Sequence, residues 1–277
     1  MKRLPCNIYL STFLYCSQQI ATANKSFMKY ILITGSCGLV GAEAVKFFNK
    51  KNFKVIGVDN NYRKFFFGPS ASVEWSKKSL KSNIKNYIHY DVDISNLKQL
   101  EKIFKKYNNK IKCIINCAAQ PSHDWAIKNI SLDFNINTIG TLNMLELFKK
   151  YSSKSCFIQI STNKVYGDTP NKLNLIEKKT RFDVQTNSKF FKGINAKMSI
   201  DNSVHSFFGV SKCSADLLTQ EFGKNLGLKT VVFRLGCITG PGHSGAVLHG
   251  FLSYLVKSNI KNKKSQIFGY KGKQVRD

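Results

Sequence analysis

The chain has 277 residues, enough for one large α/β domain with a small second lobe. Lys and Arg number 43 against 16 Asp and Glu, a formal charge of +27, but lysines supply nearly all of the excess and are scattered along the chain. Nucleic-acid recognition relies on clustered arginines with interleaved aromatics, so this pattern argues against a nucleic-acid partner and predicts a positive field that attracts anionic substrates.

The eight cysteines form no Cys-x-x-Cys pair and no zinc-ligand spacing, so we expect no metal site. Three of them, Cys113, Cys117 and Cys156, lie in apolar runs, where cysteine behaves as a small buried hydrophobe. This usage suits a reducing cytoplasm. No apolar run reaches the roughly 18 residues that a membrane-spanning helix needs, so no membrane partner is expected.

Residues 1–27 differ from the rest of the chain. Two basic residues precede an apolar run over 8–16, which faintly resembles a signal peptide, but polar residues interrupt that run. Met28 directly precedes the first predicted strand. We therefore expect Met28 to be the biological start and 1–27 to be a disordered or mis-called extension.

From residue 29 onwards, strand-like apolar runs alternate with helix-like amphipathic runs. The expected strands cover 29–34, 54–59, 87–90, 112–116, 156–160 and 230–234. The expected helices cover 39–50, 96–107, 126–151 and 206–226, with a long connection over 60–86. This alternation predicts an α/β fold with a doubly wound parallel sheet.

Ligands of such sheets bind beyond the carboxyl ends of the strands, where this chain has loop-rich, polar stretches. We therefore expect three parts along the chain: the extension over 1–27, a dinucleotide-binding core over 28–167, and a mixed remainder over 168–277, in which 204–235 completes the core and both 168–203 and 236–277 form a substrate lobe.

The turn from Thr34 to Gly41 has the sequence Thr-Gly-Ser-Cys-Gly-Leu-Val-Gly and joins the first expected strand to the first expected helix. Gly35 permits the tight turn, Gly38 lets a pyrophosphate approach the backbone, and Gly41 lets the helix pack closely on the strand. The phosphates would lie on the N–H groups at the positive end of the helix. This pattern predicts a dinucleotide site whose contacts also include Cys37, Leu39 and Val40.

Asp59 ends the second expected strand, where a carboxylate accepts hydrogen bonds from the adenosine ribose and favours NAD over NADP. An ordinary loop aspartate is the alternative. Arg63 nearby offers a 2′-phosphate contact instead, but the carboxylate of Asp59 repels a phosphate, so we predict NAD. Asn60 and Asn61 belong to the same predicted contact region.

Two further strand ends supply predicted cofactor contacts. Asp93 and Ile94 follow the third expected strand and would flank the adenine, with a helix N-cap region before 96–107 as the alternative. Small residues after the fourth expected strand would let the cofactor lie close to the backbone. The predicted contacts there and beyond are Cys117, Ala118, Ala119, Gln120, Asn137 and Ser161.

Candidate groups for chemistry follow the fourth and fifth expected strands. His123, after Ser122, is a candidate proton donor or substrate contact, with a structural role beside Asp124 as the alternative. Thr162 carries a hydroxyl at a strand end, where it can bind a reacting hydroxyl group. Lys164 is a second ionisable group in the same turn.

The segment Phe207-Phe208-Gly209-Val210-Ser211-Lys212 completes a family pattern. Together with the glycine turn, Asn-x-Ala-Ala after the fourth strand and Ser-Thr after the fifth, it makes residues 28–277 resemble an extended short-chain dehydrogenase/reductase of the nucleotide-sugar epimerase/dehydratase family. The resemblance implies a Rossmann-type fold with a small C-terminal substrate lobe and bound NAD. Longer signatures resemble the CDP-paratose (CDP-tyvelose) 2-epimerase branch; they cover 120–126, 161–168, 240–245, 248–255 and 272–277.

Position 208 departs from the family, since Phe208 stands where the resemblance implies a catalytic tyrosine, four residues before Lys212. In the family this tyrosine is the base, with a phenol pKa lowered by the lysine ammonium and the nicotinamide charge. Phe208 cannot carry a proton, whereas Lys212 can still hold the nicotinamide ribose. Either another group is the base (Lys164, His123 or Tyr166), or a sub-branch routes the proton differently, or the protein binds a nucleotide sugar without turnover.

The resemblance also implies the substrate contacts, which are Ser122, His123, Thr162, Asn163, Lys164, Cys237, His243, His249 and Arg276. Arg276 would bind the substrate diphosphate, for which a guanidinium is suited; a surface arginine near a chain end is the alternative. Family members usually continue for some tens of residues beyond the position of Asp277, so we expect a truncated lobe.

The expected function is epimerisation of a nucleotide-diphosphate sugar, with a CDP-linked deoxyhexose as the expected partner. Hydride would leave the sugar at C2 and return to the other face, with Thr162 binding the reacting hydroxyl. A dehydratase or reductase is an alternative, although Asn163 and Lys164 stand where a dehydratase has an acidic pair. A catalytically silent binding protein is another. The resemblance further implies a homodimer or tetramer through the helices expected over 126–151 and 206–226.

Overall fold

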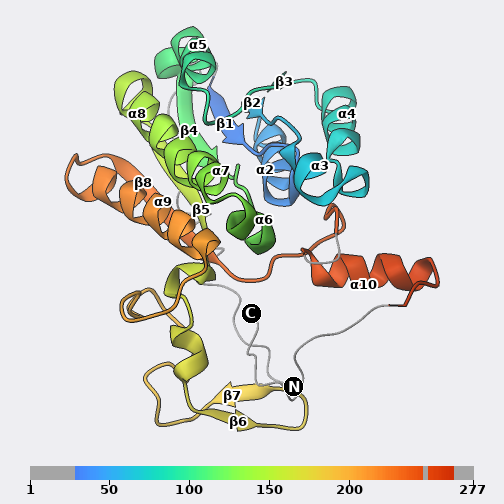
Figure 1. Cartoon of the computed structure of the whole chain (residues 1–277). Coiled ribbons are helices and arrows are strands. Elements are labelled where there is room, and N and C mark those ends of the chain that lie inside the picture. Colours follow the sequence, from blue (N-terminus) through green and yellow to red (C-terminus); the bar gives the residue numbers. More distant parts are fainter. Residues whose placement is uncertain (1–28, 246–248, 265–277) are drawn as a thin grey trace.

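A computed structural model describes residues 29–245 and 249–264. Its centre is a six-stranded sheet with the strand order β3-β2-β1-β4-β5-β8, and every neighbouring pair is parallel (Figure 1). The strands are β1 (Tyr30–Thr34), β2 (Lys54–Val58), β3 (Tyr87–Tyr90), β4 (Ile111–Asn116), β5 (Cys156–Thr162) and β8 (Lys229–Leu235). The expected Rossmann-type doubly wound sheet is confirmed, with each expected strand within two residues of its observed bounds.

Helices cover both faces of this sheet (Figure 1). One face packs against α5 (Leu97–Tyr107), α8 (Gly140–Ser152) and α9 (Phe207–Lys224). The other packs against α2 (Leu39–Lys50) and α4 (Glu74–Asn83).

The alternation of side chains along β1 shows why the sheet needs both layers. Leu32 belongs to the core on the α5 and α8 side, whereas Ile31 and Ile33 belong to the core on the α2 side. All three are fully buried. Successive side chains of a strand point to opposite faces, so a continuous apolar run like this one can be buried only between two helical layers.

Buried polar side chains join the carboxyl ends of the central strands. The Asn116 amide nitrogen donates to Oε1 of Gln159 at 2.9 Å and to Oγ1 of Thr141 at 3.2 Å. Oγ1 of Thr34 donates to Asn116 and accepts from the backbone N–H of Ala118 at 3.1 Å. These bonds fix β1, β4 and β5 relative to one another where ligands of such sheets bind.

The prediction of one continuous helix over 126–151 is wrong. The segment consists of α6 (His123–Lys128), α7 (Ile130–Phe134), one π-helical turn over 135–139, and α8. Asn129 causes the break, because its side chain accepts from the N–H of Leu132 at 2.9 Å and starts a new helix. The long connection over 60–86 also contains helices, α3 (Tyr62–Phe67) and α4.

The polar stretch over 168–203 contains a small antiparallel pair, β6 (Leu175–Glu177) and β7 (Phe182–Val184). Val165, Tyr166, Phe190 and Met198 form a separate buried cluster, with Leu173, Ile200 and Cys213 packed against it. The last described helix is α10 (Phe251–Ile260).

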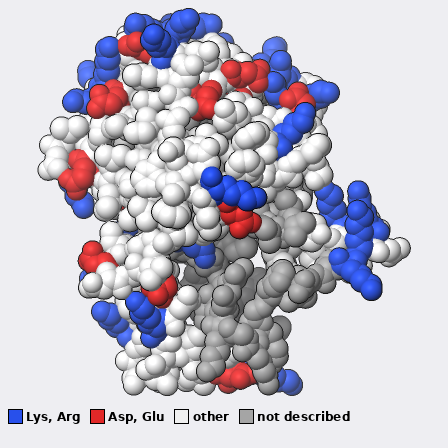
Figure 2. Space-filling model, viewed as in Figure 1, with Lys and Arg blue, Asp and Glu red and all other residues white. Residues whose placement is uncertain are grey.

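The surface view agrees with the scattered charge of the sequence. Figure 2 shows Lys and Arg over the top of the molecule, interspersed with Asp and Glu. None of the helices within the described ranges is both long and apolar enough to span a bilayer.

Candidate functional site

A cavity of about 330 Å³ lies at the carboxyl ends of the parallel strands. The glycine turn, the ends of β2, β4 and β5, the first turns of α9 and the loop after β8 surround it. The predicted residues that line it are Gly35, Gly38, Leu39, Val40, Gly41, Asp59, Asn60, Arg63, Asp93, Ile94, Cys117, Ala118, Ala119, Ser161, Thr162, Phe208, Lys212, His243 and His249. The residues predicted for the cofactor and those predicted for the sugar therefore share one cavity.

The glycine turn fits a dinucleotide. Gly35 has φ +60°, and a Cβ on it would stand 2.8 Å from the backbone nitrogen of Ala118. A Cβ on Gly41 would collide with the backbone of Gly35 and Ser36, so the helix packs directly on the turn. A Cβ on Gly38 would meet only the Gly35 carbonyl, at 3.3 Å, which leaves this backbone open to the cavity.

The amino end of α2 is also suited to a diphosphate. Gly38 occupies the N-cap position, no side chain caps the helix, and its first turn holds no acidic residue. The helix is twelve residues long, so its N–H groups and its dipole favour an anion at this end.

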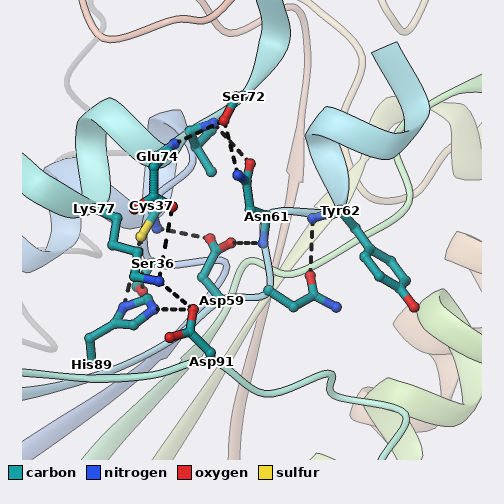
Figure 3. Close-up of polar contacts among 12 residues, drawn as sticks. Ser36, Cys37, Asp59, Asn61, Tyr62, Ser72, Glu74, Lys77, His89 and Asp91 are labelled. Carbon is teal, nitrogen blue, oxygen red and sulfur yellow. Dashed lines mark hydrogen bonds and ion pairs between the residues drawn. The ribbon is translucent and has the colours of Figure 1, made fainter. Parts of the chain in front are cut away.

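Asp59 lies between the glycine turn and the end of β2 (Figure 3). Its Oδ2 accepts from the N–H of Cys37 at 2.9 Å and its Oδ1 accepts from the N–H of Asn61 at 2.8 Å. Burial raises the pKa of Asp59, while these two bonds counteract the rise. Asp59 thus holds the turn in place as well as lining the cavity.

Cys37 and Asn61 do not line the cavity, although both were predicted cofactor contacts. Cys37 is buried, and burial raises the pKa of its thiol to about 12. The Asn61 side chain bonds instead to Ser72 Oγ at 2.9 Å and to the N–H of Val73 at 3.0 Å. The Cys37 and Asn61 side chains are therefore engaged with other protein groups and are not presented to the cavity.

The predicted adenine end lies after β3. Asp93 Oδ2 accepts from the Asn60 amide at 3.1 Å, and Asp93 Oδ1 accepts from the N–H of Ser95 at 2.8 Å. The N-cap of α5 is Asn96, which accepts from the N–H of Gln99, so Asp93 is not the cap. Tyr62, which the sequence analysis did not single out, also lines this end.

Lys212 and Phe208 lie one turn apart on α9 and both line the cavity. The Lys212 ammonium donates to the carbonyl of Ile160 at 2.9 Å, at the end of β5. Burial lowers the pKa of Lys212 to about 8. The ring of His123 packs on Phe208 with centroids 4.7 Å apart, but His123 is exposed and does not line the cavity.

The turn after β5 separates the predicted substrate residues. Thr162 lines the cavity, and its Oγ1 accepts from the N–H of Lys164 at 3.3 Å. Asn163 and Lys164 are outside the lining, as is the exposed Cys237. Arg276 lies outside the described residues, as does the extension over 1–27.

Tyr166, the third candidate base, is outside the lining as well. Its buried ring packs in the cluster with Val165, Phe190 and Met198, and its hydroxyl accepts from Arg234 at 3.1 Å. This engagement explains why the phenol is not presented to the cavity.

Gln120, Asn137 and Ser122 belong to a buried polar network rather than to the cavity wall. The Asn137 amide donates to Asp133 Oδ1 at 3.0 Å and to Ser211 Oγ at 3.1 Å. The Gln120 amide donates to Asp133 Oδ1 at 2.7 Å and to the carbonyl of Ser122 at 2.8 Å. Cofactor contacts from the Gln120 and Asn137 side chains, and a substrate contact from Ser122, gain no support from this geometry, because their polar atoms bond to protein.

Sequence analysis missed Asp133, the centre of this network. It is fully buried, and its Oδ2 has no hydrogen-bond partner among the described residues. Burial raises the pKa of Asp133. The spacing of Asp133 and Asn137, four residues apart in a helical segment, was the signal that could have found the pair.

Arg63 contacts the loop after β8. One of its guanidinium nitrogens donates to the carbonyl of Ser244 at 2.6 Å, and two lie 3.3 Å from Nδ1 of His249. The guanidinium also stacks over Phe67 at 5.0 Å, and the His243 ring packs on His249 at 5.8 Å. A predicted cofactor residue and two predicted substrate residues therefore form one cluster.

Comparisons with known proteins agree with this geometry. A family model described as "NAD dependent epimerase/dehydratase family" matches residues 31–277. The chain is 30% identical over 260 residues to the CDP-paratose 2-epimerase of Salmonella typhi, covering 89% of this chain and 70% of that protein. It is 27% identical over 252 residues to the UDP-glucuronate 4-epimerase of Thermodesulfobacterium geofontis, covering 90% and 67%.

Solved structures share the fold. The dTDP-glucose 4,6-dehydratase of Bacillus anthracis in complex with NAD has a TM-score of 0.59 at 24% identity, covering 87% of this chain and 64% of that one. The UDP-glucose 4-epimerase of Thermus thermophilus in complex with NAD has a TM-score of 0.63 at 20% identity, covering 84% and 63%. The matched part is thus somewhat under two thirds of each solved chain. With the family model spanning nearly all of the described core, the chain belongs to the NAD dependent epimerase/dehydratase family.

Proposed function

We propose that the chain is an NAD-dependent epimerase of a nucleotide-diphosphate sugar, with a CDP-linked deoxyhexose of the paratose type as its substrate. One observation carries the proposal: a single cavity joins a dinucleotide-binding turn to Thr162 and Lys212. A site that only stored a nucleotide would not need a hydroxyl and an amine at its far end.

The residues of the cavity suit NAD. The glycine turn and the amino end of α2 would hold the diphosphate, and Asp59 would lie near the adenosine ribose. NAD supplies the chemistry of accepting a hydride from a sugar carbon and returning it. This chain contributes orientation, since Thr162 would bind the reacting hydroxyl and Lys212 would hold the nicotinamide ribose beside the end of β5.

Two observations support a CDP-linked sugar as the substrate. The segments 161–168 and 272–277 carry the signatures of the CDP-paratose 2-epimerase branch, and the Salmonella epimerase is 30% identical. The positive charge of the chain would attract a diphosphate of any nucleotide and does not select among them.

Phe208 supports a second candidate function, binding of NAD and a nucleotide sugar without turnover. Its phenyl ring lines the cavity where the family pattern has a phenol, and it offers no proton acceptor. A dehydratase has less support, because Asn163 and Lys164 follow Thr162 and neither lines the cavity.

The test uses the full chain. Purified protein is denatured and the supernatant is assayed for NAD by chromatography, then native protein is incubated with CDP-paratose and the sugars are separated. Bound NAD with formation of the 2-epimer is the expected result. Bound NAD with CDP-paratose unchanged would instead support the binding protein, and absence of both would overturn the proposal.

A further inference from the structure

We propose that Lys212 is itself the proton acceptor of this site, taking the hydroxyl proton of the sugar directly. The inference rests on the proposed epimerase function and deepens it. Oxidation of a sugar carbon releases a proton from its hydroxyl, so a titratable group must lie beside the hydroxyl, and Phe208 is not one.

The position of the amine is fixed by the end of β5. Nζ of Lys212 donates to the carbonyl of Ile160 at 2.9 Å, and Ile160 is two residues before Thr162 on the same strand. Lys212, Phe208 and Thr162 all line the same cavity. Because Phe208 precedes Lys212 by four residues on α9, both side chains lie on one face of the helix.

The carboxylates of the cavity are too far from this strand end. β5 is separated from β2 by β1 and β4, so Asp59 lies three strand spacings away, about 14 Å. Asp93 follows β3, one spacing farther, at about 19 Å. Tyr62 shares that distant end, where it interacts with Asp93.

The other titratable groups of the lining are poor acceptors. Burial raises the pKa of Cys117 to about 12. Burial is the main cause that lowers the pKa of His249 to about 3, and the positive charge of Arg63 lowers it further. Nδ1 of His249 lies 3.3 Å from the Arg63 guanidinium. His243 packs against His249, and burial lowers its pKa as well.

Three groups face the Lys212 amine from the surrounding elements: Cys117 after β4, Asp133 on α7 and Asp216 on α9. Their charges raise the pKa of Lys212, but burial outweighs them and lowers it to about 8. Asp216 is already paired with Arg234, and the charge of Asp133 is disfavoured by its own burial. An amine with a pKa near the working pH suits general-base catalysis.

The step balances without a further reactant. The O–H bond of the sugar would break and its proton would move to the neutral amine of Lys212, while NAD, when bound, would supply the acceptor for the hydride from the same carbon. A carbonyl would form at that carbon. On return of the hydride to the opposite face, the Lys212 ammonium would give the proton back, so that the amine is neutral again and no further reactant is needed.

Chemical rescue is the first test. Lys212→Ala, at saturating NAD, is assayed for epimer formation from CDP-paratose with and without ethylamine. We expect turnover of Lys212→Ala to fall at least a hundredfold below that of the wild-type chain. Ethylamine should raise the turnover of the variant at least tenfold, and the increase should be larger at higher pH, where more of the amine is neutral. Lys154→Ala removes an exposed lysine on the loop before β5 and is the matched control, with unchanged turnover and no response to ethylamine.

A direct titration avoids any dependence on turnover. The rate at which acetic anhydride modifies Lys212 is measured by mass spectrometry from pH 6 to 11 in the NAD-free full chain. A midpoint near pH 8 supports the proposal, and a midpoint at or above 10.5, the ordinary lysine value, overturns it.

The outcomes separate the two proposals. If the wild-type chain forms epimer but ethylamine does not rescue Lys212→Ala, the epimerase stands and the role of Lys212 is overturned. If the wild-type chain holds NAD and forms no epimer, the epimerase proposal fails, and the role of Lys212 as its base fails with it whatever the titration midpoint is.

Discussion

Removal of Arg234 tests the buried ion pair that it forms with Asp216, a residue that also bonds to Ser161 at the end of β5. Nε of Arg234 donates to Asp216 Oδ2 and its Nη2 donates to Asp216 Oδ1, both at 2.9 Å. Asp216 is fully buried and also accepts from Ser161 Oγ at 2.6 Å and from the Gln220 amide at 2.7 Å. Arg234→Gln would leave this carboxylate buried with two neutral donors and no cation bonded to it.

Breaking a buried ion pair by removing one partner costs about 3–5 kcal/mol. Because two donors to Asp216 remain, we expect Arg234→Gln to lower the free energy of unfolding by about 3 kcal/mol, at the lower end of that range. The chain offers a matched control, since Arg181 makes the same two-bonded contact with Asp183, at 2.8 and 3.0 Å. The Arg181 side chain is 61% exposed against 16% for Arg234, so Arg181→Gln is expected to cost much less stability than Arg234→Gln.

The assay is urea unfolding of both variants beside the wild-type chain, followed by tryptophan fluorescence and circular dichroism. A double variant, Arg234→Gln with Asp216→Asn, removes the stranded charge and should recover part of the loss. Equal losses for the Arg234 and Arg181 variants would refute the reasoning, because burial is the main difference between the two contacts.

Three further predictions concern the cofactor end and the polar network. Gly41→Ala should abolish NAD binding and lower the melting temperature, because the added Cβ meets the Gly35 backbone; calorimetry measures both. Asp59→Asn should weaken NAD binding about tenfold in isothermal titration, through loss of a ribose acceptor worth about 1.4 kcal/mol. Burial raises the Asp133 pKa, so the folded chain binds that proton more tightly than the unfolded chain, and this contribution to stability falls as pH rises. Asp133→Asn should therefore raise the free energy of unfolding at pH 8 in urea unfolding, with the gain vanishing as the pH falls to the ordinary carboxyl range.

The sheet could be predicted because its signals are local. The strands β1, β2 and β4 are apolar runs that are almost wholly buried, and three glycines at fixed spacing indicate the turn after β1. The break at Asn129 was missed because a side-chain cap competes with an otherwise continuous helical pattern, and only the cap geometry decides between them.

The sequence indicates which residues line the cavity where they follow a strand, but it does not indicate contacts between distant segments. Thr162 and Asp59 line the cavity because the ends of parallel strands meet at one edge. The contact of Arg63 with His249 joins residues 186 positions apart, and no spacing in the sequence indicates it. The same holds for Asp216, whose partner Arg234 lies on the next strand.

The side-chain amide of Asn116 on β4 links the carboxyl ends of β1 and β5. It bonds to Thr34 below the glycine turn and to Gln159 on the strand that ends in Thr162. A shift of either neighbouring strand would have to break a buried bond, so the strand ends that carry the glycine turn and Thr162 keep a fixed separation. Adaptation to a longer or shorter substrate would then require changes in the loops that follow the strands, while the distance between the ends of β1 and β5 stays constant.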